Sequence, residues 1–115
     1  RARGGHDIMG PGEIKCRWPL GGSNVEYVGE DHFWAASTGV GYSRGVQDQG
    51  VVATVKHCTA NNSEYDRHKT SADVDERTLR EIYFPAFEAA VKEAGVGAVM
   101  FSYNPLNGVH SSLHK

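Results

Sequence analysis

Lys56 and His57 place a cation beside an imidazole at the end of a short apolar run, residues 51–55. That run is rich in β-branched residues and predicts a strand buried on both faces. Burying these two polar side chains in the interior of such a strand would be unfavourable. Open α/β sheets and barrels present their chemistry at the carboxyl ends of their strands. We therefore expect Lys56 and His57 to lie at the carboxyl end of this strand.

The chemistry available to this pair is hydrogen bonding to hydroxyl groups. A lysine ammonium offers three donors, and a neutral imidazole offers one donor and one acceptor. Sugar hydroxyls can both donate and accept, so the pair suits a sugar. A purely structural interpretation is equally open: an exposed lysine, with a histidine bonded to nearby backbone.

Two other chemistries are less well supported by the residue pattern. Lys56 could form a Schiff base if its amine were desolvated, but the adjacent histidine and the acid-rich loop that follows argue against a neutral amine. A metal site would use His57, His68 and either Asp66 or Asp73. That spacing matches no known zinc pattern, so we predict no metal and no cofactor.

The elements that must position these residues alternate along the chain. Residues 6–9 form a possible first strand, and Asp31 can cap a helix over residues 32–48. The clearest element is a second helix at about 76–94, with apolar residues at three- and four-residue spacing. A last apolar run, residues 96–101, predicts a strand. This order predicts an α/β fold with parallel strands and helical crossovers.

Details of the two helices can also be predicted. The first should bury a stripe made of Phe33, Ala36, Val40 and Ser43. The second should begin at a capping box formed by Asp73 and Glu76, be kinked or split by Pro85 near Phe84 and end at Gly95. Its buried face should contain Leu79, Ile82, Phe87 and Val91.

Tyr103 follows the last predicted strand in a Ser-Tyr-Asn sequence. Parallel strands have their carboxyl ends at one edge of the sheet, so Tyr103 should lie on the same side as Lys56 and His57. It suits a pocket and a half-buried core position equally well.

Length and charge exclude several classes of protein. The chain has 115 residues and a net charge of −2, with no basic stripe. Nucleic acid and anionic membranes are therefore poor candidate partners. No apolar stretch approaches the roughly 20 residues of a membrane-spanning helix. Cys16 and Cys58 are expected to be free thiols.

Several sequence blocks together resemble the family 3 glycoside hydrolases, in particular their bacterial β-glucosidase branch. They occur in the expected order over nearly the whole chain: Gly10-Pro11-Gly12, Gly21-Gly22, Glu26-Tyr27, Glu30-Asp31, Val55-Lys56-His57-Cys58, Ala60-Asn61-Asn62, the run from Asp75 to Tyr83, Met100-Phe101-Ser102-Tyr103-Asn104 and Asn107-Gly108.

This resemblance implies a partial (β/α)8 barrel and retaining hydrolysis of terminal β-linked glucosides or related sugars. It implies that Lys56 and His57 hydrogen-bond sugar hydroxyls in the cleavage subsite. Tyr103 matches an aromatic residue near the nucleophile in the same subsite. Arg67 matches a supporting arginine in the loop after the pair. The expected partner is a β-glucoside or related sugar.

Four positions depart from the family pattern. Ser23 stands where the family usually has an arginine that also binds the sugar. Trp18 replaces a common aspartate, His32 a common proline, and Cys58 a usual aromatic residue. The missing arginine leaves a second possibility open: a non-catalytic carbohydrate-binding or degenerate relative that keeps Lys56 and His57.

Length limits what these residues can do alone. A complete barrel takes roughly 250 residues, so we expect residues 1–115 to form part of the N-terminal barrel domain of a longer enzyme. Its catalytic nucleophile and acid/base are expected on later elements, and no catalytic residue is assigned here. The preferred sugar, its linkage, the oligomeric state and the compartment stay open.

Overall fold

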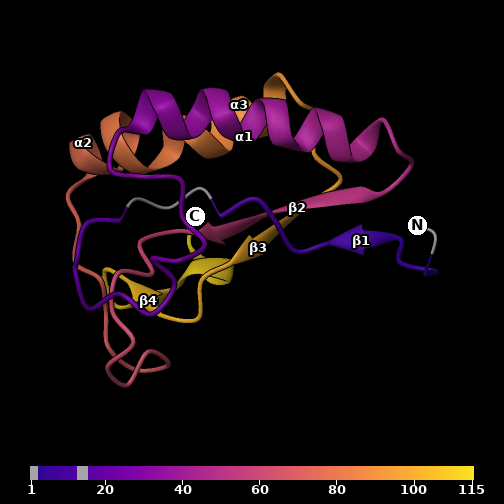
Figure 1. Cartoon of the computed structure of the whole chain (residues 1–115). Helices are drawn as coiled ribbons and strands as arrows, with labels where there is room; N and C mark the ends of the chain where they lie inside the picture. The colour runs from indigo at the N-terminus through magenta and orange to yellow at the C-terminus, as the bar shows by residue number, and fades with distance from the viewer. Residues whose placement is uncertain (1–2, 13–15) are drawn as a thin grey trace.

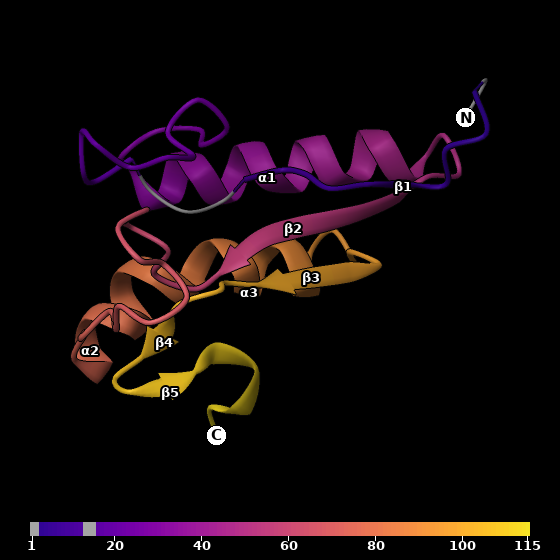
Figure 2. The same ribbon diagram turned by 90° about the horizontal axis from the view of Figure 1, so that it is seen from below.

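The computed structural model describes residues 3–12 and 16–115. In Figures 1 and 2, helices cover one face of a small twisted sheet. Within the described residues, no helix has the length and apolar character needed to cross a bilayer. The elements are, in order, β1 (Asp7–Ile8), α1 (His32–Gln47), β2 (Val52–Cys58), α2 (Glu76–Thr78), the π-helical turn η1 (Leu79–Tyr83), α3 (Phe84–Lys92), β3 (Ala98–Phe101), β4 (Pro105–Leu106), β5 (Val109–His110) and the 3₁₀ turn η2 (Ser111–Leu113).

The main sheet has the order β1–β2–β3, and both of its pairings are parallel. β2 is therefore central, with its backbone hydrogen-bonded on both sides. This confirms the predicted alternation of parallel strands and helical crossovers. The predicted burial of β2 holds for Ala53, Thr54 and Val55, whereas Val52 at its start is exposed. β4 and β5 form a separate antiparallel pair near the C-terminal end of the chain.

The pairing of β2 with β3 shifts by one residue at its carboxyl end. Lys56 lies opposite Met100, and Cys58 lies opposite the next residue, Phe101. His57 is therefore the extra residue of a bulge. Bulges bend a strand and redirect the side chain that they carry, so this irregularity determines where the His57 imidazole points.

Helix α1 lies against the sheet and α3, as Figure 1 shows. Asp31 caps it as predicted, because its Oδ1 accepts a hydrogen bond of 2.7 Å from the backbone N–H of Trp34. The buried face consists of Ala35, Gly39, Val40 and Ser43. The predicted burial of Phe33 is wrong: the side chain is 75% exposed. Each helical residue advances about 100°, so Phe33 lies on nearly the same side of the helix as the buried Val40, seven residues later. Its exposure follows from its place in the first turn, before the first buried residue, Ala35.

The second predicted helix loses its regular α-helical geometry just before Phe84, where Pro85 was expected to kink or split it. It runs through α2, the π-helical turn and α3, and the N–H of Phe84 bonds back to the carbonyl of Leu79. Pro85 then lies in the first turn of α3, where a missing N–H costs nothing. Gly95, just beyond the helix, adopts a φ of +58° that favours glycine.

The predicted capping box at Asp73 is wrong. Asp75 caps α2 by accepting hydrogen bonds from the backbone N–H and hydroxyl of Thr78, at 3.0 and 2.6 Å. Asp73 instead accepts a hydrogen bond from the hydroxyl of Ser71. A local side-chain bond in the preceding loop therefore occupies the carboxylate that was expected to cap the helix.

Two apolar clusters hold the helices on the sheet. Val55 of β2 packs against Phe87 and Ala90 of α3 in the first. The second contains Ala60, Leu79, Tyr83 and Leu106. Burial of Leu79 and Phe87 was predicted correctly. Ile82 is only half-buried, and Val91 is 52% exposed, which contradicts its predicted burial.

Removing the aromatic ring from the first cluster should destabilise the fold strongly. We expect Phe87→Ala to lower the free energy of unfolding by about 3–5 kcal/mol, the usual cost of emptying a buried aromatic site. The matched control is Val91→Ala in the same helix, with an expected change within about 0.5 kcal/mol. Urea denaturation followed by circular dichroism measures both. Equal losses would show that the face of α3 has been assigned wrongly.

Candidate functional site

Lys56 lies at the end of β2 in an ion pair. Its Nζ is 2.6 Å from Oε2 of Glu26, and the Lys56 side chain is only 16% exposed. A cation with so little access to water needs a counter-charge. Glu26 supplies it from the irregular segment that precedes α1. The ion pair therefore fixes the ammonium group at the carboxyl end of the central strand.

His57, the bulged residue, is 8% exposed. Its Nδ1 lies 3.2 Å from the phenol oxygen of Tyr27, and the two rings meet edge to face. Burial lowers the pKa of His57 below its ordinary value of 6.5, and the neighbouring charge of Lys56 acts in the same direction. The imidazole is therefore neutral at physiological pH, with one donor and one acceptor nitrogen.

Arg67 and Tyr103 form the second half of the site. The guanidinium carbon of Arg67 lies 4.8 Å from the centre of the Tyr103 ring, in a cation–π contact. The His68 ring lies 5.0 Å from the same ring. Glu64 holds Arg67 from the same loop through an ion pair of 3.0 Å. Tyr103 is thus contacted by residues of the loop that follows β2, and 47% of it stays exposed.

The structure gathers these predicted residues at one edge of the sheet. Lys56 and His57 end β2, and Tyr103 follows the parallel neighbour β3, so all three lie at carboxyl ends, as predicted. The charges of Arg67 and Glu64 also act on the pKa of His57, in opposite directions. Their effect on the imidazole links the two halves of the site.

Glu26 and Tyr27 were not predicted as site residues. Both belong to a segment without helical or strand periodicity, so no pattern indicated that they would reach β2. Gly12 brings them there, through bridges to both Tyr27 and Lys56. A Cβ at Gly12 would lie 2.8 Å from Cδ1 of Tyr27 and 2.9 Å from the Glu26 carbonyl oxygen. Only glycine permits this approach.

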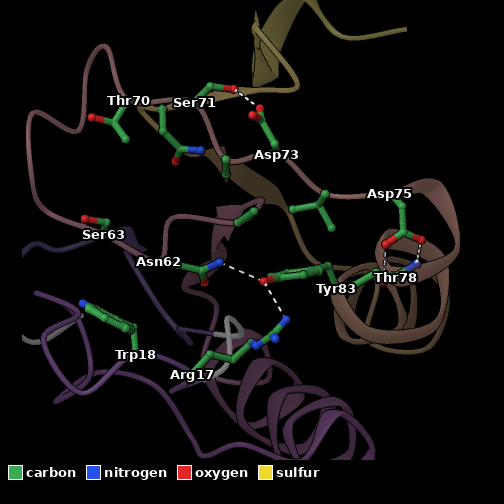
Figure 3. Close-up of a pocket in the computed structure, with 14 residues that line it drawn as sticks. Arg17, Trp18, Asn62, Ser63, Thr70, Ser71, Asp73, Asp75, Thr78 and Tyr83 are labelled. Carbon is green, nitrogen blue, oxygen red and sulfur yellow. Dashed lines mark hydrogen bonds between the residues drawn. The ribbon is translucent and has the colours of Figure 1, made fainter.

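A separate pocket of about 690 Å³ lies beside the site, and none of the predicted site residues lines it. Figure 3 shows its main polar contacts, in which Arg17 and Asn62 both donate to the phenol oxygen of Tyr83, at 3.2 and 2.8 Å. The carboxylates of Asp73 and Asp75 also line it but already accept hydrogen bonds from neighbouring hydroxyls. The pocket walls therefore bond mainly to one another.

The candidate metal ligands do not assemble. Across residues 3–12 and 16–115, no group of three or more His, Cys, Asp or Glu side chains could hold a metal ion. Asp66 pairs with Lys69, and Asp73 bonds to Ser71. Cys16 and Cys58 are free thiols, as predicted, and burial raises the pKa of Cys58 above its ordinary value of 9.0.

The lowered pKa of His57 makes folding sensitive to pH. The unfolded chain binds a proton near pH 6.5, whereas the folded chain binds it only at lower pH. Stability should therefore be lost as pH falls from about 6.5 towards the folded pKa. Denaturation curves between about pH 7.5 and 5 should show a smaller decline for His57→Gln than for the unaltered chain. Identical declines would contradict the buried, neutral imidazole.

Comparisons with known proteins identify the family of this chain. The model of the glycosyl hydrolase family 3 N-terminal domain matches residues 14–115. A β-glucosidase from Rhizobium radiobacter is 52% identical over 112 residues, which are 97% of this chain and 14% of that protein. An exo-α-(1→6)-L-arabinopyranosidase from Bifidobacterium longum is 50% identical over 105 residues, 91% of this chain and 14% of that protein.

A solved structure shows the same fold. DesR, a β-glucosidase from Streptomyces venezuelae in complex with D-glucose, matches with a TM-score of 0.91 and 44% identity, covering 96% of this chain and 14% of that one. The chain thus spans a small part of each protein that it matches. The predicted partial barrel is confirmed by this likeness. Sequence and fold together show that this chain belongs to glycosyl hydrolase family 3, in the family's N-terminal domain.

Proposed function

We propose that this chain supplies part of the sugar-binding subsite of a β-glucosidase-like enzyme, which hydrolyses terminal β-linked sugars with retention. The observation that carries the proposal is the gathering of Lys56, His57, Arg67 and Tyr103 at one edge of the parallel sheet. The β-glucosidase from Rhizobium radiobacter and the D-glucose complex of DesR support it.

Each half of the site would have its own role. Lys56 and His57 would donate hydrogen bonds to sugar hydroxyls. Tyr103, held by Arg67, would present an aromatic ring to the C–H face of the sugar. The donors are held by protein contacts before a sugar arrives, so little side-chain entropy is lost on binding.

Retaining hydrolysis also requires two carboxyl groups about 5–5.5 Å apart, one as nucleophile and one as acid/base. We assign neither to this chain. Among the acids of the site, Glu26 is paired with Lys56 and Glu64 with Arg67. These pairs suit binding and positioning. In the proposal, the chain contributes binding groups, and the reacting carboxylates come from other parts of a longer protein.

The sugar that the enzyme prefers must be determined by experiment. The relatives from Rhizobium radiobacter and Bifidobacterium longum have nearly equal identity to this chain. Their names give them different substrates, a β-glucoside and an α-(1→6)-linked L-arabinopyranoside. The longest natural chain that contains these residues should therefore be assayed with nitrophenyl β-glucoside and nitrophenyl α-L-arabinopyranoside. If neither substrate is hydrolysed but glucose binds measurably, the result favours the non-catalytic carbohydrate-binding alternative. The observation that favours this alternative is Ser23, which stands where the family usually has an arginine.

Removing either donor should weaken catalysis in that longer chain. We expect Lys56→Ala and His57→Ala each to lower kcat/KM by about 5- to 150-fold, which corresponds to about 1–3 kcal/mol for a hydrogen bond left unmade in a buried site. Lys92→Ala, whose lysine lies on the exposed side of α3, is the control and should change nothing. Normal kinetics for both site variants would mean that the pair is structural.

Restoring the family residue should strengthen sugar binding. Ser23→Arg introduces a guanidinium that can donate several fixed hydrogen bonds to hydroxyls, which serine is too short to make. A lower Kd for glucose, measured by calorimetry, is the expected result. Unchanged or weaker binding would show that residues 17–31 hold position 23 away from the sugar.

A further inference from the structure

We propose that Glu26 and Tyr27 are positioning residues for Lys56 and His57, and that Tyr27 holds His57 as the tautomer whose ring proton is on Nε2. This inference rests on the proposed function for its catalytic consequence. The tautomer itself rests on the contact between Tyr27 and His57 and on the protonated phenol and neutral imidazole that form it. It adds to the site two residues that touch the binding pair and have no predicted contact with the sugar.

The first argument is that the neighbours Glu26 and Tyr27 contact the neighbours Lys56 and His57, one to one. Glu26 contacts Lys56 at 2.6 Å, and Tyr27 contacts His57 at 3.2 Å. Gly12 bridges both segments, with backbone pairing to Tyr27 and to Lys56. One backbone approach therefore sets both side-chain contacts, and the two donors of the site are oriented together.

The second argument concerns the direction of the hydrogen bond between Tyr27 and His57. Burial is the main cause that raises the pKa of the Tyr27 phenol above 10.0, so the phenol keeps its proton. That proton needs an acceptor, and Nδ1 of His57 lies within hydrogen-bond distance of the phenol oxygen, at 3.2 Å. The phenol's own proton is then free to point at Nδ1.

The third argument follows from the neutral imidazole. A neutral ring has one protonated nitrogen. If Nδ1 accepts from Tyr27, the proton must be on Nε2, and His57 can only donate through that nitrogen. Lys56 uses one donor for Glu26 and has two left. The pair would thus present donors alone, selecting sugar oxygens that act as acceptors.

The tautomer can be tested without any sugar in the longest natural chain that contains these residues. Nitrogen-15 chemical shifts of His57 at about pH 7.5 should show an unprotonated Nδ1 and a protonated Nε2. Tyr27→Phe, which removes only the phenol hydroxyl, should shift both nitrogens towards a mixture of tautomers. Tyr65→Phe is the control, because Tyr65 is 83% exposed and has no aromatic contact in the described structure. A protonated Nδ1 in the unaltered chain overturns the inference.

The positioning role is tested by kinetics in the longer natural chain. Tyr27→Phe and Glu26→Gln should each lower kcat/KM about tenfold, the loss expected for one misplaced hydrogen bond. In a His57→Ala background, Tyr27→Phe should cause no further loss of kcat/KM. Glu26→Gln should likewise cause no further loss in a Lys56→Ala background, because each residue acts through its partner. Unchanged thermal unfolding would exclude a general folding defect.

The outcomes separate this inference from the proposed function. If His57→Ala lowers kcat/KM but Tyr27→Phe does not, the positioning role is overturned and the sugar-binding function stands. If His57→Ala has no effect, the proposed function falls, while the nitrogen shifts still decide the tautomer. If the losses of Tyr27→Phe and His57→Ala add fully, Tyr27 acts on its own and the inference is wrong.

Discussion

The parallel pairing of β2 with its two neighbours is the constraint on which the rest of the structure depends. It places the carboxyl ends of β2 and β3 at one edge, where the shift in pairing leaves His57 as an extra residue. Without that shift, His57 would follow the regular alternation of the strand. The apolar contact of Val55 with Phe87 then holds α3 on the sheet. A hydrophobic contact thus holds the helix on the sheet, and the shift in strand pairing orients the imidazole of His57.

Most of the fold could be predicted because its main signals are local. The apolar runs at residues 51–55 and 96–101 predicted parallel strands, and Pro85 predicted an irregularity of the second helix near Phe84. The errors concern which of several similar residues caps a helix or lies on its buried face. Asp73 and Asp75 are both acids before the same helix. Asp75 accepts hydrogen bonds from Thr78 inside the helix, whereas Asp73 accepts one from Ser71 in the preceding loop. Phe33 and Val91 show that apolar character and helical spacing alone do not determine whether a residue is buried.

The site was predictable in part, for a related reason. Lys56, His57 and Tyr103 follow strands, so their position at one edge follows from topology. The contact of Arg67 with Tyr103 depends on the path of an irregular loop, and only the resemblance to a family indicated a role for Arg67. Glu26 and Tyr27 reach β2 through Gly12. That approach depends on backbone shape, which residue periodicity does not encode.

The two irregular segments on either side of α1 and β2 are fitted into each other. A Cβ at Gly22 would lie 2.1 Å from Cγ of Glu64, so one loop fills the space that a side chain of the other would need. Arg17 and Asn62, one from each segment, also share the phenol of Tyr83. Grafting one loop alone from a relative would therefore leave a steric overlap or an unfilled gap. Engineering a new sugar preference on this scaffold requires that both loops be exchanged as a single unit.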